Sequence, residues 1–319
     1  MGPHISPGFA MNFPKNIIKL QELTREQLSD LFSLADNIRE NQEKYRHSLD
    51  GLVMAAPFYE NSTRTRWSFE AAMRRLGGNV IDFAGPEGTS IMKGETLSDT
   101  IKMASGYSHV IVLRHKYDGA AELAREVSNI PVLNGGDGKN QHPTQTMLDL
   151  YTIKRELGSI EGKKVAIVGD LRYGRTTHSL LIGLSMFNAK ATLVSPPTLK
   201  MHEKHKRTAE QVNPKFKYQE ETSLDKALWD ADVVYMTRIQ KERFPDQQEY
   251  EKVKHAYVFR KEQLEKLDQK SIIMHPLPRV DEIAYEVDKD PRAAYFRQAE
   301  NGLYTRMALL QKVLGEREQ

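Results

Sequence analysis

Short apolar runs alternate with helix-like segments along the chain, and this alternation restricts the possible folds more than any other feature. The run at residues 165–168, for example, precedes apolar residues at helical spacing, namely Leu180, Leu181, Leu184 and Phe187. Strands that alternate with helices predict a parallel sheet covered on both faces. We expect strands at residues 53–59, 80–83, 109–113 and 131–134, and again at 165–168, 191–195, 233–237 and 271–274.

The length of 319 residues favours two domains. We predict an α/β protein with two doubly wound domains, each a parallel sheet flanked by helices, joined by long interdomain helices. The first domain is expected at residues 12–157 and the second at 158–290, with a boundary between Gly158 and Gly162. A last helix, expected to start at Asp290-Pro291 and to span residues 291–316, would pack back on the first domain. Residues 1–11 are interpreted as a tail.

Composition narrows the function classes. Basic and acidic side chains number 46 and 43, a net charge of +3 without a polybasic block, so nucleic acid is not favoured as a partner. The absence of cysteine excludes disulfides, thiolate catalysis and Cys-ligated zinc, and is compatible with the cytoplasmic location that we expect. No apolar run approaches the ~18 residues of a membrane helix.

A phosphate site is suggested where the first expected strand meets the next helix. Ser62 is a candidate N-cap, and Thr63, Arg64 and Thr65 follow it at the start of a helix that Gly77-Gly78 would end. Hydroxyls, a guanidinium and unpaired N–H groups at a helix N-terminus suit a tetrahedral dianion. Taken alone, these residues are more often a capped helix with a solvated arginine face.

Further polar residues follow other expected strands. Arg114 lies at the end of the strand at 109–113, and Pro143 favours a helix start that puts His142 at the cap, with Gln145 facing the same opening. A lone histidine is usually satisfied structurally, which is the alternative for His142. Lys93 lies in a loop at residues 84–95, a length more often functional or mobile than idle.

Two arginines in the second half form a candidate carboxylate site. Arg175 belongs to the loop at residues 169–176, which lacks the G-x-G-x-x-G spacing of a dinucleotide loop, and Arg238 follows the strand at 233–237. Two bidentate arginines recognise a substrate with two carboxylates. Surface ion pairs are the alternative.

These motifs, in this order, resemble those of the aspartate/ornithine carbamoyltransferases over nearly the whole chain. Ser-Thr-Arg-Thr-Arg at 62–66 is similar to their carbamoyl phosphate motif, and His-Pro-Leu-Pro-Arg at 275–279 resembles the members that use aspartate, because ornithine enzymes carry His-Cys-Leu-Pro there. The resemblance implies transfer of a carbamoyl group from carbamoyl phosphate to the α-amino group of L-aspartate, giving N-carbamoyl-L-aspartate and phosphate in de novo pyrimidine biosynthesis.

The resemblance also implies roles for individual residues. Thr65, Arg114 and His142 would polarise the carbamoyl oxygen, while Lys93 would reach the site of a neighbouring chain in a homotrimer. No metal or cofactor is expected, and the sequence leaves open whether a separate regulatory chain binds this one. The carbamoyl phosphate residues would be Ser62, Thr63, Arg64, Thr65, Arg114, His142, Gln145, Leu277 and Pro278, and the aspartate residues Lys93, Arg175, Arg238 and Gln240.

Two other functions remain open at this point. One is a carbamoyltransferase with another amine acceptor, such as ornithine. The other is a non-catalytic module that keeps the anion site without turnover.

Overall fold

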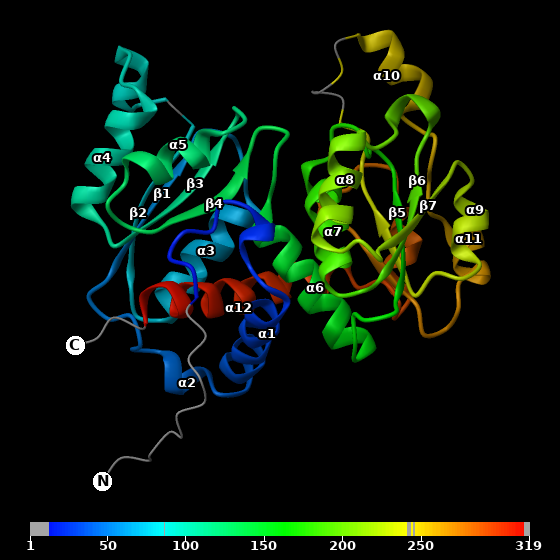
Figure 1. Ribbon diagram of the computed structural model, residues 1–319, viewed down its shortest axis with the longest axis horizontal. Coiled ribbons are helices and arrows are strands. Elements are labelled where there is room, and N and C mark those ends of the chain that lie inside the picture. Colours follow the sequence, from blue (N-terminus) through cyan, green and yellow to red (C-terminus); the bar gives the residue numbers. More distant parts are fainter. Residues whose placement is uncertain (1–12, 86, 241–243, 245, 316–319) are drawn as a thin grey trace.

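Two parallel sheets form separate lobes of the molecule (Figure 1). The computed structural model describes residues 13–85, 87–240, 244 and 246–315, so the tail predicted at residues 1–11 lies outside the described residues. The strand order is β2-β1-β3-β4 in the first sheet and β7-β6-β5-β8-β9 in the second. The predicted fold class, two parallel sheets flanked by helices, is confirmed.

The first sheet is buried on both faces. Successive residues of a strand point to opposite sides, so Met54 of β1 joins the core against α3 and α12, while Ala55 packs with the core beneath α4 and α5. The first α-helix of this lobe is α1, whose N-cap Thr24 forms a capping box with Gln27. The elements are α1 (Arg25–Glu40), α2 (Gln42–Tyr45), β1 (Val53–Phe58), α3 (Arg64–Arg75), β2 (Asn79–Ala84), α4 (Leu97–Tyr107), β3 (Val110–His115), α5 (Ala120–Val127) and β4 (Val132–Asp137).

The second sheet contains one strand that the sequence did not predict. Among the described residues β7 pairs with β6 alone and forms an edge of the sheet, and its sequence Lys-Tyr-Gln-Glu-Glu is largely polar. An edge strand needs little apolar surface, so an apolar run is a poor signal for it. The elements are β5 (Lys164–Val168), α7 (Arg175–Met186), β6 (Lys190–Val194), α8 (Glu203–Val212), β7 (Lys217–Glu221), α9 (Leu224–Leu228), β8 (Val233–Met236), α10 (Gln247–Val253), α11 (Lys261–Lys266) and β9 (Ile272–Met274).

Two long helices connect the lobes, α6 (Pro143–Leu157) and α12 (Tyr295–Leu314). α12 packs against α1, α3 and α6, and one continuous apolar core includes residues of both sheets, such as Val112 and Ile167. Among the described residues, no helix is long and apolar enough to cross a membrane.

The predicted start of the last helix at Asp290-Pro291 is wrong. The backbone N–H of Ile273 donates to the carbonyl of Arg292, and the backbone N–H of Ala294 donates to the carbonyl of Ile273. The segment from Arg292 to Ala294 therefore lies along the edge of the sheet before the helix begins. Asp290 also binds the Arg292 guanidinium and holds the turn. The helix therefore starts at Tyr295.

Candidate active site

A cleft of about 620 Å³ lies between the lobes, at the carboxyl ends of strands from both sheets. Ligands of open α/β sheets bind at these ends. We call it the interlobe cleft. It is lined by Glu60, Asn61, Ser62, Thr63, Arg64, Thr65, Arg114, His142, Gln145, Arg175, Thr176, Thr237, Arg238, Gln240, His275, Pro276, Leu277 and Pro278.

The N-terminus of α3 opens into this cleft without a side-chain cap. The N-cap is Thr63 and not Ser62, and the Thr63 side chain accepts no hydrogen bond from the first turn. The reason for the difference is that Thr63 itself has helical torsion angles, φ −79° and ψ −60°, so its hydroxyl does not reach back to the first turn. The uncapped N–H groups and the positive end of the helix dipole remain directed to the cleft, where they favour an anion.

Glu60 holds two of the arginines. Its Oε2 lies 3.1 Å from Arg114 Nη2 and 2.8 Å from Arg175 Nη2, which joins a residue of the first lobe to one of the second. Arg175 Nη1 also donates to the carbonyl of Gly138 at 2.6 Å. Gly136 lies beneath both guanidinium groups at φ +112°, and an added Cβ would sit 3.1 Å from Arg175 Cζ. A larger residue there would displace the arginines.

His142 is a buried neutral imidazole. Its Nε2 lies 3.3 Å from Thr65 Oγ1, and its backbone N donates to Ser179 Oγ at 3.1 Å. Burial, followed by the charges of Arg114 and Arg175, holds the pKa of His142 well below its ordinary value of 6.5. It can therefore donate or accept a hydrogen bond at Nε2 near pH 7 without carrying charge.

The second lobe contributes Arg238 from the end of β8. Desolvation, and then the charge of Arg238, lowers the pKa of Arg64, so the two guanidinium groups act on each other across the cleft. The adjoining loop is ordered by the buried Asp170, whose carboxylate accepts from the backbone N of Arg172 and of Gln240. Glu60 is the single carboxylate among the described lining residues, so the cleft has an excess of positive charge.

The segment after β9 is held by a buried histidine. His275 Nδ1 accepts from Leu277 N at 2.7 Å, so its proton is on Nε2, which donates to Glu282 Oε1 at 2.6 Å. This pairing fixes the turn that brings Leu277 and Pro278 to the cleft wall.

The structure brings together every predicted site residue except Lys93. Lys93 is exposed on a 3-10 turn, Ser90–Lys93, and does not line the cleft of its own chain. Sequence reasoning assigned no role to Glu60, although an acidic residue directly after a buried strand and before the Ser-Thr-Arg run was a usable signal. It also missed Thr176 and Thr237, which line the cleft beside Arg175 and Arg238.

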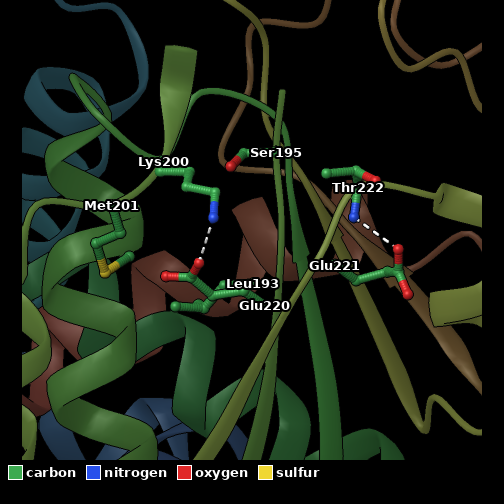
Figure 2. A pocket seen from close by; sticks show the side chains of 7 residues that line it. All are labelled: Leu193, Ser195, Lys200, Met201, Glu220, Glu221 and Thr222. Atoms are coloured by element: carbon green, nitrogen blue, oxygen red, sulfur yellow. Dashed lines mark hydrogen bonds and ion pairs between the residues drawn. The ribbon is translucent and has the colours of Figure 1, made fainter. Parts of the chain in front are cut away.

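A second hollow of about 150 Å³ lies at the ends of β6 and β7 (Figure 2). Figure 2 shows that Lys200 pairs with Glu220 and the backbone N of Thr222 with Glu221. The distance from Lys200 Nζ to Glu220 Oε2 is 2.7 Å. The described part of the chain holds no group of three or more metal-ligating side chains. We therefore assign the candidate site to the interlobe cleft.

Comparison with known proteins gives consistent matches along the chain. The family description "Aspartate/ornithine carbamoyltransferase, carbamoyl-P binding domain" matches residues 15–155, and the "Asp/Orn binding domain" of the same family matches residues 161–313. The chain is 50% identical to the aspartate carbamoyltransferase catalytic subunit of Thermoplasma acidophilum over 304 residues, which is 95% of this chain and 99% of the relative.

Solved structures are similar as well. The catalytic subunit of Methanocaldococcus jannaschii aspartate transcarbamoylase has a TM-score of 0.86 at 49% identity, covering 94% of this chain and 98% of that chain. Trypanosoma cruzi aspartate transcarbamoylase in complex with carbamoyl phosphate and aspartate has a TM-score of 0.90 at 40% identity, covering 94% and 96%.

Proposed function

The chain belongs to the aspartate/ornithine carbamoyltransferase family, and from this premise we propose that its interlobe cleft transfers the carbamoyl group of carbamoyl phosphate to the α-amino group of L-aspartate. The products are N-carbamoyl-L-aspartate and phosphate, as in de novo pyrimidine biosynthesis. The observation that carries the proposal is the placement of arginines from both lobes in one cleft with the neutral imidazole of His142. Two anionic substrates need such a cleft, and neither needs a nucleophile from the protein.

Carbamoyl phosphate is assigned to the first lobe. Its phosphate occupies the N-terminus of α3, where Ser62, Thr63, Arg64 and Thr65 surround it. Its carbonyl oxygen points to the Thr65 hydroxyl, Arg114 and the imidazole of His142, which lie together at this wall. The α-amino nitrogen of aspartate forms a bond to the carbamoyl carbon, and the bond from that carbon to the phosphate oxygen breaks. The departing phosphate keeps the electron pair of that bond and takes up the proton that the amine loses.

The rate enhancement then comes from positioning and from fixed charge. Negative charge that develops on the carbonyl oxygen in the tetrahedral intermediate is stabilised by groups that are already held in place. Arg114 is one of them, because its Nη1 donates to the carbonyl of Gly135. No covalent enzyme intermediate is required.

Aspartate is assigned to Arg175, Arg238 and Gln240. A substrate carboxylate that approaches Arg175 must share or displace Glu60, because Glu60 pairs with the same Nη2 atom. The binding energy of aspartate is thereby coupled to an ion pair that spans the lobes.

We further propose a homotrimer in which Lys93 enters the cleft of a neighbouring chain, with the protein in the cytoplasm. The exposed position of Lys93, away from its own cleft, supports this arrangement. The test mixes two inactive variants, Lys93→Ala and His142→Ala, after dissociation. Mixed rings should regain roughly one intact site in three, and mixing should restore nothing if each site is built within one chain. Light scattering on protein from the native source would reveal the trimer and any regulatory chain.

The function itself is tested with a colorimetric ureido assay. Carbamoyl phosphate should give product with L-aspartate and not with ornithine or N-acetylornithine. Product with ornithine in place of aspartate would assign another acceptor, and phosphate binding without any ureido product would make the chain a non-catalytic anion-binding module.

A further inference from the structure

A buried carboxylate lies behind the wall that carries Gln145. Asp149 is one helical turn further along α6 and is 0% exposed. Its Oδ1 accepts from Gln145 Nε2 at 2.9 Å and from Gln298 Nε2 at 2.7 Å, and its Oδ2 accepts from the Tyr235 hydroxyl at 2.8 Å. The three donors come from α6, α12 and β8, so this one side chain connects both lobes with the helix that crosses between them.

The direction of these hydrogen bonds is fixed at one end by the backbone. The N–H of His275 donates to Gln298 Oε1 at 2.8 Å, and a backbone N–H cannot act as an acceptor. Gln298 must therefore turn its NH2 group towards Asp149. Oδ1 of Asp149 is then required as an acceptor, whether or not Oδ2 carries a proton, because a proton on Oδ2 faces Tyr235, whose hydroxyl oxygen can accept it.

The same constraint sets the side-chain amide of Gln145. Since Oδ1 of Asp149 only accepts, Gln145 must present Nε2 to it, and the remaining amide atom, Oε1, is the one available to the cleft that Gln145 lines. An isolated glutamine could present either its oxygen or its NH2 group, because the two orientations have nearly the same shape. Because Asp149 and Gln298 are buried, water cannot replace these hydrogen bonds and so cannot permit the other orientation of the Gln145 amide.

We propose that Asp149 is a positioning residue that makes the cleft selective for an acyl phosphate carrying an NH2 group. It does so by holding Gln145 with its carbonyl oxygen towards the bound substrate, where a carbamoyl NH2 donates to it. A site built to pair with a substrate N–H discriminates strongly against an analogue that lacks it, because its acceptor is then left without a partner. This inference rests on the proposed function.

The test compares carbamoyl phosphate with acetyl phosphate, in which a methyl group replaces the NH2 group. The readout is the ratio of the acetyl phosphate Ki to the carbamoyl phosphate KM, measured with aspartate at saturation. Asp149→Ser removes the fixed acceptor and leaves room for water, and its hydroxyl can donate or accept. The expected result is a fall of at least tenfold in the ratio, with the acetyl phosphate Ki changed less than threefold.

Three further variants separate positioning from general damage. Gln145→Met should give the same loss of ratio, and adding Asp149→Ser to it should lower the ratio no further, because Asp149 acts through Gln145. Asp149→Asn should keep the ratio, since Gln298 still requires an oxygen at the Oδ1 position. Tyr235→Phe, the matched control, removes the donor to Oδ2 and leaves the Oδ1 acceptor that Gln145 and Gln298 share, so it should also keep the ratio.

Several outcomes would overturn the inference. Equal weakening of both acyl phosphates by Asp149→Ser would make Asp149 a structural residue only, and so would additive losses in the double variant. If Asp149→Ser does not fold, the other two variants decide. A lower ratio in Asp149→Asn refutes the fixed orientation of the Gln145 amide. An unchanged ratio in Asp149→Asn together with a lower ratio in Gln145→Met supports that orientation. A wild-type enzyme that forms no carbamoyl aspartate would instead refute the proposed function, which the ureido assay measures separately.

Discussion

Replacement of Asp149 by asparagine should change how the stability of the protein depends on pH. Burial raises the pKa of Asp149 to about 7 from an ordinary value of 3.8, despite the hydrogen bonds from Gln298, Tyr235 and Gln145 that favour the charged form. A carboxyl whose pKa is raised by folding binds its proton more tightly in the folded state. Its contribution to stability is therefore fully present below about pH 4 and is lost as the pH rises through about 7.

The magnitude follows from the difference between the two pKa values. A carboxyl of pKa about 7 in the folded chain and 3.8 in the unfolded chain contributes about 2–3 kcal/mol less stability at pH 8 than at pH 5. An asparagine side chain does not titrate, so the Asp149→Asn protein should lack this decrease. The other buried groups, such as His142, titrate in both proteins and cancel in the difference.

The assay is urea unfolding of the wild-type and variant proteins at pH 5, 6, 7 and 8, at one protein concentration. The free energy of unfolding of the variant minus that of the wild type should become more favourable to the variant by about 2–3 kcal/mol from pH 5 to pH 8. A difference that is constant with pH would show that Asp149 has the same pKa in the folded and unfolded chains. A difference of the opposite sign would show a carboxylate stabilised by its neighbours.

Three other predictions concern the cleft and the second lobe. Arg238→Ala should lower kcat/KM for aspartate, a loss of transition-state stabilisation on the order of 2–4 kcal/mol, while carbamoyl phosphate binding changes little. Equal loss for both substrates in steady-state kinetics and direct binding would contradict the assignment of Arg238 to aspartate. His178 and His205 are stacked with ring centroids 3.7 Å apart, and burial lowers their pKa values to about 4 and about 3. Their contribution to stability is present above pH 6.5 and is lost as the pH falls. The free energy of unfolding of His205→Phe should therefore fall by about 2 kcal/mol less than that of the wild type between pH 7 and pH 4.5. An equal fall for both proteins in urea titrations would count against this prediction. A phosphonate joined to aspartate should slow hydrogen exchange both at the start of α3 and around Arg238, whereas carbamoyl phosphate alone should slow it at α3; equal protection by both ligands would argue against two half-sites.

Most strands could be predicted because burial on both faces leaves a simple sequence signal. Most residues of β3 and β8 are apolar, and each apolar residue packs into the core on one face of the sheet or the other. β7 could not be predicted in this way, because an edge strand with a solvated face has polar residues at most positions. The start of α12 depends on hydrogen bonds to Ile273, which no local pattern around Pro291 reports.

The candidate site was predictable where its residues are local and not where they depend on distant partners. Ser62 to Thr65 and His142 to Gln145 each belong to one strand-to-helix connection, so the sequence places them together. Asp149 is different. It is separated from Tyr235 by 86 positions and from Gln298 by 149. On the sequence alone it is an acidic residue in an amphipathic helix, and only the packing of α6, α12 and β8 shows that it is buried.

The charges that attract two anions also limit what His142 can do. Burial and the nearby Arg114 and Arg175 keep its imidazole neutral near pH 7 by lowering its pKa. A neutral imidazole donates one hydrogen bond to a carbonyl oxygen, and these same cations oppose the imidazolium that would be needed to protonate that oxygen. In the reaction that we propose, charge that develops on the oxygen is therefore stabilised by the Arg114 guanidinium and the Thr65 hydroxyl, both held in place before the reaction begins. Under this proposal, Arg114 both attracts the anionic substrate and stabilises the transition state, while His142 orients the carbonyl oxygen without carrying charge.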